Sequence, residues 1–242
     1  MRYAILSDVH ANLEALEATL KALSEKQVDH YVVLGDIINY GANPKEVLAK
    51  LTELTPDILM GNHELALFDP NLENYFNPIA RDALAWTRTQ LSEEEKAKIR
   101  AFPLTKELEQ CLFVHACPLN PQEFYYIFTQ NEAQNMFGSF NQPVCFIGHT
   151  HVPSLFTQGA KDAEALQPGV INLRKNRKQI VNVGSVGQSR DFDWRASCAV
   201  FDDQAFTVEL LRVEYEWQVA MEKIRAAGLP HYLAERLEPR AT

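Results

Sequence analysis

Histidine, aspartate and asparagine side chains recur at the points where apolar runs of this chain end. Five of the seven histidines lie in such places, namely His10, His63, His115, His149 and His151. Asp8, Asp36 and Asn62 occupy the same kind of position. In open α/β sheets, ligands bind beyond the carboxyl ends of the strands, so we expect these eight residues to converge although they span most of the chain.

This set of side chains predicts a metal centre. Imidazole nitrogens together with carboxylate oxygens suit divalent manganese, iron, zinc or nickel. The set is larger than one tetrahedral site needs and contains no cysteine, which argues against a structural zinc site. The surplus predicts two ions with open positions, spaced about 3.5–4 Å as in two-metal hydrolytic sites. Such a spacing needs a bridging carboxylate, and Asp36, which follows the second apolar run, is the expected bridge.

The elements that position these residues can be predicted from the apolar runs themselves. We interpret these runs as buried strands whose last residue emerges at the carboxyl end: "AILSD", "YVVLGD", "ILMGN", "LFVH" and "VCFIGH". Residues 13–23 place leucines on one helical face, with Asn12 as the expected cap, and a second helix starts with Asn43 and Pro44. The early chain is therefore β-α-β-α-β, which implies parallel strands with right-handed crossovers.

The rest of the chain departs from this alternation twice. Residues 65–102 predict a helical insertion, which either acts as a lid over the site or only packs on the core. After residue 170, the runs "KQIVNVGS", "ASCAVFD" and "FTVELLRVEY" predict an antiparallel meander and then a last helix. The predicted fold class is α/β. We expect a single domain over residues 1–242, built as a four-layer α-β-β-α sandwich of two packed mixed β-sheets flanked by helices.

Composition limits the kinds of partner. The chain has 242 residues and a net charge of −9, which disfavours extended nucleic acid as a partner. A small anionic substrate requires a site that brings its own positive charge. No apolar run approaches the ~20 residues of a membrane helix, and the start "MRYAILSDVH" lacks the features of a signal peptide. We therefore predict a cytoplasmic protein that does not bind membranes, and the sequence leaves its oligomeric state open.

The order of these motifs resembles that of the calcineurin-like metallophosphoesterase superfamily. The motifs are "DVH" at 8–10, "GD" at 35–36, "GNHE" at 61–64, a strand-end histidine at 115 and "GHTH" at 148–151. Further stretches, "GDIINYGANP", "NVGSVGQSRD" and "AGLPHYLAERL", look like the small prokaryotic phosphodiesterase-like branch. The resemblance covers nearly the whole chain.

The resemblance implies a role for each residue. Asp8, His10 and His151 would hold the first metal, Asn62, His115 and His149 the second, and Asp36 would bridge both. On an extended segment, His149 and His151 would point the same way and reach two ions of one cluster. His63, which is not among the ligands, would protonate the leaving alkoxide. The alternative is that His63 only orients the residues around it.

The implied activity is dinuclear, metal-dependent hydrolysis of small phosphodiesters or phosphomonoesters by attack of a metal-activated hydroxide. The alternative within enzymes is an asymmetrical dinucleoside polyphosphate pyrophosphohydrolase. A non-catalytic scaffold of the same fold is less consistent with the sequence because every ligand position is filled. A nuclease is disfavoured by the acidic balance of the chain.

Three residues are candidates for substrate binding. Arg190, in a glycine-rich loop, either clamps a substrate phosphate or pairs with Asp191 or Asp193. Asn39 and Tyr40 follow Asp36 and either line the pocket or serve as turn residues. Protein serine/threonine phosphatases and symmetrical dinucleoside tetraphosphate hydrolases carry an arginine after their "GD" motif, where this chain has Tyr40. Both substrate classes are therefore disfavoured.

Overall fold

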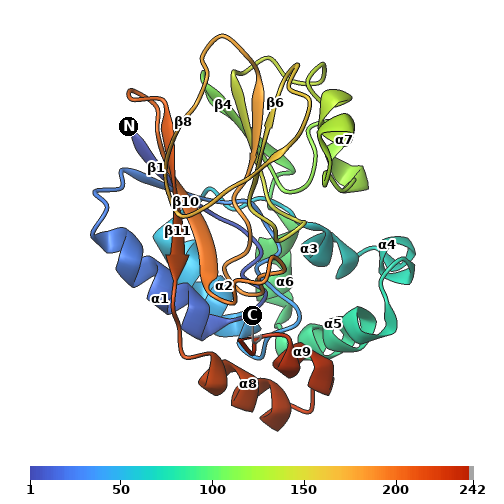
Figure 1. The fold of residues 1–242 in the computed structure, drawn as a ribbon. Coiled ribbons are helices and arrows are strands. Elements are labelled where there is room, and N and C mark those ends of the chain that lie inside the picture. The colour runs from blue at the N-terminus through green and yellow to red at the C-terminus, as the bar shows by residue number, and fades with distance from the viewer. Residues whose placement is uncertain (240–242) are drawn as a thin grey trace.

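Two β-sheets pack face to face, and helices cover their outer faces, as the computed structural model shows (Figure 1). The structure describes residues 1–239. The first sheet has five strands in the order β2-β1-β10-β11-β8. Its strands are β1 (Arg2–Leu6), β2 (His30–Val33), β8 (Gly169–Asn172), β10 (Ala196–Asp202) and β11 (Thr207–Val213).

The second sheet has six strands in the order β3-β4-β5-β9-β6-β7. Its strands are β3 (Thr105–Glu107), β4 (Cys111–Val114), β5 (Val144–Ile147), β6 (Ser154–Thr157), β7 (Glu164–Ala165) and β9 (Gln179–Asn182). Both sheets are mixed, because β1 and β2 are parallel and β4, β5 and β9 are parallel, while the other neighbours are antiparallel. The predicted sandwich of two mixed sheets with flanking helices is confirmed.

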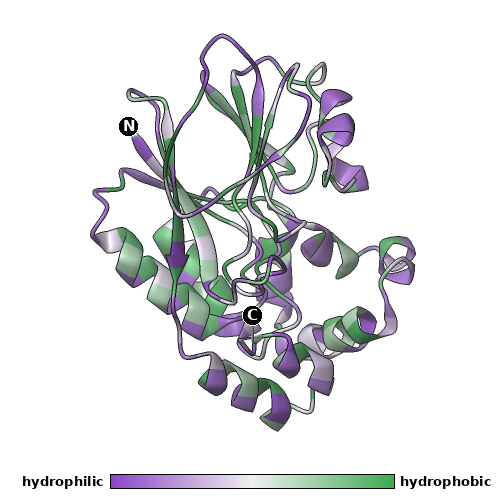
Figure 2. Cartoon of the chain, in the orientation of Figure 1, coloured by the Kyte–Doolittle hydropathy of each residue, from purple (hydrophilic) through white to green (hydrophobic). Residues whose placement is uncertain are grey.

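The four layers follow from the two-residue period of the strands. Along β1, Ile5 points into the core between the sheets, while Ala4 and Leu6 pack under the helices on the outer face. Along β5, Phe146 points inward and Cys145 packs outward, in the cluster that includes residues of α7 (Gln130–Gln134). Both faces of these strands are therefore buried, which explains their continuous apolar runs. Figure 2 shows the strands mostly in the apolar colours, whereas helices such as α1 carry both polar and apolar residues.

Helices α1 (Leu13–Ser24), α2 (Pro44–Leu54), α8 (Trp217–Ala226) and α9 (His231–Glu235) lie on the first sheet's side of the molecule. The Asn12 side chain caps α1 as predicted, because its Oδ1 accepts the Ala15 N–H at 3.1 Å. Asn43 precedes α2, but its side chain makes no capping hydrogen bond. The Asn12 amide also donates to the Gly187 carbonyl at 2.9 Å, which joins the loop after β1 to the loop after β9.

Residues 62–100 form the predicted helical segment. It contains α3 (Asn62–Ala66), α4 (Pro70–Asn74), α5 (Pro78–Gln90) and α6 (Glu93–Arg100). Ser92 and Glu95 form the predicted capping box of α6. Two contacts join this segment to residues predicted to form the active site. The centroid of the Phe76 ring lies 4.6 Å from that of the His63 ring, and the Ala80 carbonyl accepts a hydrogen bond from the Asn39 side chain. That the segment acts as a lid, and that the whole chain is one domain, stay predictions.

Two strand predictions need correction. The run "ILMGN" forms no full strand, and an isolated bridge joins Ile58 to Val33. The pairing stops there because the next N–H on that side, that of Gly61, is donated to Glu64 Oε2 at 2.9 Å. The run at 179–182 does not join the predicted antiparallel meander. It becomes β9 of the second sheet, parallel to β5 and antiparallel to β6. In the first sheet, β8, β11 and β10 pair as antiparallel neighbours, and β10 also pairs antiparallel with β1.

Within residues 1–239, no helix combines the length and the apolar character that crossing a bilayer requires.

Candidate active site

The residues predicted as ligands meet at one edge of the two sheets. Three groups of buried side chains place their ligand atoms within 4.8 Å of one another. The groups are Asp8, His10 and His151; His10, Asp36 and His63; and Asp36, His115 and His149. The strand tips therefore converge as the sequence predicted.

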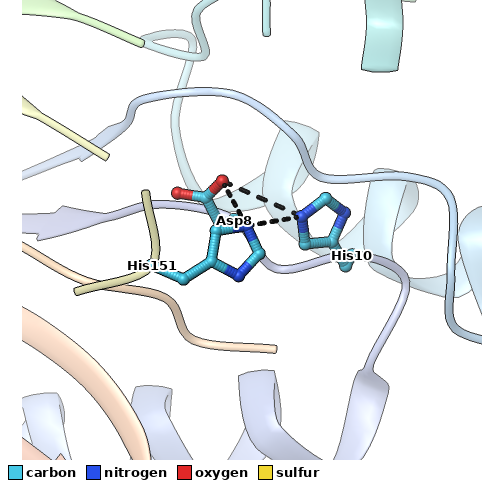
Figure 3. A group of neighbouring side chains, drawn as sticks. All are labelled: Asp8, His10 and His151. Atoms are coloured by element: carbon cyan, nitrogen blue, oxygen red, sulfur yellow. Dashed lines mark hydrogen bonds and ion pairs between the residues drawn. The ribbon is translucent and has the colours of Figure 1, made fainter. Parts of the chain in front are cut away.

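The first cluster consists of Asp8, His10 and His151 (Figure 3). Asp8 Oδ1 lies 3.2 Å from His151 Nε2 and 3.8 Å from His10 Nε2. The two imidazole Nε2 atoms are 3.2 Å apart. Three ligand atoms from the loops after β1 and β5 thus face one common point.

The second cluster is centred on His115, which follows β4. Its Nε2 lies 3.1 Å from His149 Nδ1, 3.2 Å from Asn62 Oδ1 and 3.3 Å from Asp36 Oδ2. Asn62 is the first residue of α3. The start of a helix therefore supplies this oxygen, while residues that follow strands supply the other ligand atoms of the cluster.

Asp36 lies between the two clusters. Its Oδ2 is 3.8 Å from His10 Nε2 on one side and 3.3 Å from His115 Nε2 on the other. Its Oδ1 accepts the backbone N–H of His63 at 2.9 Å. One carboxylate oxygen is therefore shared by both clusters, while the other holds α3 in place.

Backbone carbonyls fix the orientation of three of these rings. The Nδ1 atoms of His10 and His115 lie 3.1 Å from the carbonyls of Ile38 and Leu34. The Nδ1 atom of His151 lies 2.5 Å from the carbonyl of Gln188. Since a carbonyl can only accept, each Nδ1 carries a proton and each Nε2 is the ring nitrogen that faces the centre. His149 is reversed and directs its Nδ1 to the centre.

Many of these residues adopt the left-handed backbone conformation. Asp8, His10, Asp36, His149 and His151 have φ values of 53°, 48°, 52°, 65° and 63°. Such values are uncommon for residues other than glycine and concentrate at functional sites. They also correct one prediction, because residues 149–151 form a turn and not an extended segment. The two histidines of "GHTH" nevertheless reach different clusters.

The donor atoms fit metal ions. Asp8 Oδ2 accepts from Ser7 Oγ at 2.6 Å and from the His149 N–H at 2.9 Å, whereas the buried Oδ1 has no hydrogen-bond donor among the described residues. Such an atom is costly to bury without a partner. Ligand atoms about 2.1 Å from one ion lie about 3.0 Å apart across an octahedral edge and about 3.4 Å across a tetrahedral edge. Separations of 3.1–3.3 Å in both clusters match this range, whereas His10 Nε2 lies farther, at 3.8 Å, from the oxygens of Asp8 and Asp36.

Protonation of the rings supports the same interpretation. Burial lowers the pKa of His10 well below its ordinary value and lowers the pKa of His149 to about 3, so both rings keep their lone pairs at neutral pH. For His115, burial also lowers the pKa, but the carboxylates of Asp36, Asp8 and Glu64 together outweigh this effect and raise the pKa to about 9. A cation that binds beside Asp36 would take the place of this proton.

His63 lies beside the bridge and forms a group with His10 and Asp36, but it belongs to neither the first nor the second cluster described above. Its Nε2 is 3.8 Å from Asp36 Oδ2, and its Nδ1 lies 2.7 Å from Asn39 Nδ2. The Asn39 amide is oriented by two other bonds, since its Oδ1 accepts the Tyr40 N–H at 2.8 Å and its Nδ2 donates to the Ala80 carbonyl at 3.2 Å. Asn39 can therefore only donate to His63, and the neutral ring carries its proton on Nε2, the atom that faces the centre.

The predicted substrate-binding residues lie around this centre. The Tyr40 ring is 4.5 Å from the His10 ring and 4.7 Å from the His63 ring. Arg190 donates from Nη2 to Gln188 Oε1 at 3.2 Å, and its buried Nε has no partner among the described residues. Asp191 and Asp193 pair with Arg212 and Arg195 instead. Arg190 lines a hollow of about 140 Å³ together with Trp194 and Arg236. Asn39 is fully buried beneath His63. Substrate contacts of all three residues stay predictions.

Glu64 is a functional residue whose role the sequence reasoning missed. Its Oε2 accepts the N–H groups of Asp36 at 2.7 Å and Gly61 at 2.9 Å. Its Oε1 accepts those of Ile37 at 2.9 Å and Ile38 at 3.2 Å. This buried carboxylate therefore holds the turn that carries Asp36 against the start of α3. Its place in "GNHE" was the available signal.

Comparison with known proteins gives the family. Residues 1–205 match the family model of the calcineurin-like phosphoesterase superfamily domain. The chain belongs to the calcineurin-like phosphoesterase superfamily. The predicted family is thus confirmed.

Individual proteins resemble the chain along nearly its whole length. An uncharacterized protein of Methanocaldococcus jannaschii is 34% identical over 238 residues, which are 97% of this chain and 96% of that protein. The crystal structure of a metallophosphoesterase from Sphaerobacter thermophilus superposes with a TM-score of 0.89 at 36% identity, covering 99% of each chain. The fold of a hypothetical protein from Pyrococcus horikoshii OT3 is also similar, with a TM-score of 0.78 at 18% identity over 100% of this chain and 99% of that one.

Proposed function

We propose that this calcineurin-like phosphoesterase hydrolyses small phosphate esters, diesters or monoesters, at a centre of two divalent cations. The observation that carries the proposal is the pair of ligand clusters that share Asp36 Oδ2. The first site would use Asp8, His10, Asp36 and His151, and the second would use Asp36, Asn62, His115 and His149. Manganese, iron, zinc and nickel all suit this mixture of nitrogen and oxygen donors.

When bound, such ions lower the pKa of coordinated water and offset charge on phosphoryl oxygens. The chain itself would supply orientation and hydrogen bonding. The backbone carbonyls of Leu34, Ile38 and Gln188 hold three rings with their Nε2 atoms inward, so the ligand geometry is set before substrate arrives.

His63 would act on the leaving group. Because Asn39 donates to Nδ1, the Nε2–H of His63 faces the centre and can donate to the leaving oxygen. Burial lowers the pKa of His63 to about 4, so the ring is neutral at pH 7 and acts there as a hydrogen-bond donor. Arg190, whose Nε lacks a partner in the described part of the chain, would bind a non-bridging phosphate oxygen or a second anionic group.

The acidic chain favours a small substrate over extended nucleic acid. In this proposal, the positive charge needed for phosphate comes from the cations and from Arg190, not from an extended basic surface.

The test is metal analysis followed by an activity panel. Protein purified without chelator is analysed for metals and then assayed with added manganese on phosphomonoesters, phosphodiesters and dinucleoside polyphosphates. We expect about two ions per chain and hydrolysis of at least one ester class, and we expect Asp36→Asn to lose both. A metal-binding protein that cleaves only dinucleoside polyphosphates would point to the pyrophosphohydrolase. A protein that binds no metal and cleaves nothing would contradict the proposal and favour a scaffold.

A further inference from the structure

The loop after β4 exposes several large apolar side chains beside the centre. Between His115 and α7, the side chains of Leu119, Tyr125, Tyr126 and Phe128 are all exposed, with 47% of Tyr126 and 56% of Phe128 accessible. Exposed clusters of this kind often mark binding surfaces.

Two of these rings form a column that begins at a predicted metal ligand. The Tyr126 ring stacks on the His149 ring with centroids 3.9 Å apart and planes at 24°. The Phe128 ring stacks on Tyr126 at 5.3 Å and 7°. The column therefore runs from the centre toward solvent and ends in an exposed flat ring.

The loop is held in this shape from both sides. Phe124 is buried in the left-handed conformation, with φ of 49°, and its ring lies 5.9 Å from His115 and 6.5 Å from His149. At the other end, Glu132 of α7 accepts the N–H groups of Phe128 and Thr129, both at 2.8 Å. A ligand that uses the column would therefore meet a largely preformed surface, which lowers the entropic cost of binding.

Charge at the base of the column favours a phosphate there. The Arg190 side chain hydrogen-bonds to the Tyr126 hydroxyl, and the carboxylates of Asp36 and Asp8 are close enough to interact with it electrostatically. The Tyr126 hydroxyl is thus close to the bridge and to the guanidinium predicted to bind phosphate. A phosphoryl group at the centre would place its ester substituent near the column.

We propose that the stacked rings of Tyr126 and Phe128 bind the planar aromatic part of the substrate, so that the preferred esters carry a nucleoside or an aryl group. This inference rests on the proposed phosphoesterase function. Flat rings suit this ligand because stacking of a base on an aromatic side chain is favourable and tolerates any base.

Two matched pairs of ligands test the proposal. Calorimetry on the manganese-loaded protein compares phenylphosphonate with cyclohexylphosphonate, which share the phosphonate and a six-carbon ring but differ in whether that ring is flat and aromatic. Competitive inhibition, measured from initial rates on one common ester, compares AMP with ribose 5-phosphate, which lacks the base. We expect the flat or base-bearing member to bind about 5- to 150-fold more tightly, the range that base–aromatic stacking gives. A preference in only one pair would identify the source as aryl or nucleoside.

Variants of the loop show which side chains cause the preference for the flat or base-bearing ligand. Phe128→Leu keeps apolar volume but removes the flat ring, and Tyr126→Ala removes the middle of the column, so both should reduce the preference toward one. Tyr126→Phe should retain it. Tyr125→Ala is the matched control because Tyr125 is 48% exposed in the same loop and has no ring contact among the described residues.

Equal binding within both pairs would overturn the proposal, and so would a preference that survives Phe128→Leu and Tyr126→Ala. An equal loss in Tyr125→Ala would also overturn it, because it would attribute the effect to the loop in general. Failure of the phosphoesterase function is separate, since it would appear as no hydrolysis of any ester while the phosphonate comparison could still be made.

Discussion

Replacing Gly148 with alanine should damage the first metal site through a single methyl group. Gly148 precedes His149 and lies against the loop after β1. A Cβ atom there would lie 1.9 Å from Ser7 Oγ and 2.4 Å from Asp8 Oδ2. Ordinary van der Waals contact begins at 3.4 Å, so the Asp8 oxygen must move by about 1.0 Å and the Ser7 hydroxyl by about 1.5 Å.

The expected magnitude follows from these displacements. Metal–ligand distances stay within about 0.2 Å of their standard values, so shifts of this size distort the site, and disruption of groups that orient ligands costs about 10- to 100-fold in metal affinity. Overpacking of this kind costs about 1–3 kcal/mol of stability, which corresponds to a fall in Tm of about 2–12 °C for a chain of this size.

The assay is calorimetric titration with manganese, together with thermal unfolding in chelator. Gly138→Ala is the control, because a Cβ there meets nothing within 4 Å and the residue has no positive φ. It should leave metal affinity unchanged and stability within about 1 kcal/mol. Wild-type metal affinity and Tm in Gly148→Ala would refute the packing of this loop against Asp8.

The remaining predictions concern the ligands and the buried histidines. His63→Gln should lower kcat by about 10²- to 10⁴-fold with metal content unchanged, and Asn39→Leu should lower kcat less. If either variant hydrolysed an ester with a poor leaving group at the wild-type rate, that result would contradict the role of His63. Asp8→Asn should leave the chelated protein about as stable, because Asp8 Oδ1 lacks a donor among the described residues. It should, however, remove much of the stabilisation by metal, which is about 2.7 kcal/mol at 100 times Kd; an unchanged metal-induced rise in Tm would contradict this. The chelated protein should lose stability as pH falls from 6.5 toward 4, because burial lowers the pKa of His63 to about 4 and of His149 to about 3, so the unfolded state binds more protons. Urea unfolding at pH 7 and pH 5 measures the free energy of unfolding of the chelated protein. Equal values at the two pH values would show that the rings of His63 and His149 are not buried as neutral groups.

Much of the site could be predicted from the sequence because each ligand follows an apolar run. Parallel strands bring their carboxyl ends to one edge, so Asp8 and Asp36, which follow the paired strands β1 and β2, had to approach one another once the runs were interpreted as strands. His115 follows a strand of the second sheet and meets them through the packing of the two sheets. The metal-ligand assignment itself still awaits a bound ion. The sequence could not show that His149 and His151 lie in a turn of left-handed residues, since only the surrounding structure imposes such backbone angles.

Other features depend on contacts between distant segments. The placement of β9 beside β5 depends on tertiary packing, because its four residues are buried on both faces whichever sheet they join. The Asn39–His63 hydrogen bond and the stack of Tyr126 on His149 join residues 24 and 23 positions apart. No periodicity in the sequence encodes such pairs, and for that reason Tyr126 was overlooked.

The most direct test is anomalous diffraction from crystals grown with manganese. The account predicts two peaks about 3.5–4 Å apart. One peak should lie within bonding distance of Asp8, His10 and His151, and the other of Asn62, His115 and His149, with Asp36 touching both. A single peak, or peaks away from Asp36, would contradict the two-cation centre on which the proposed function rests.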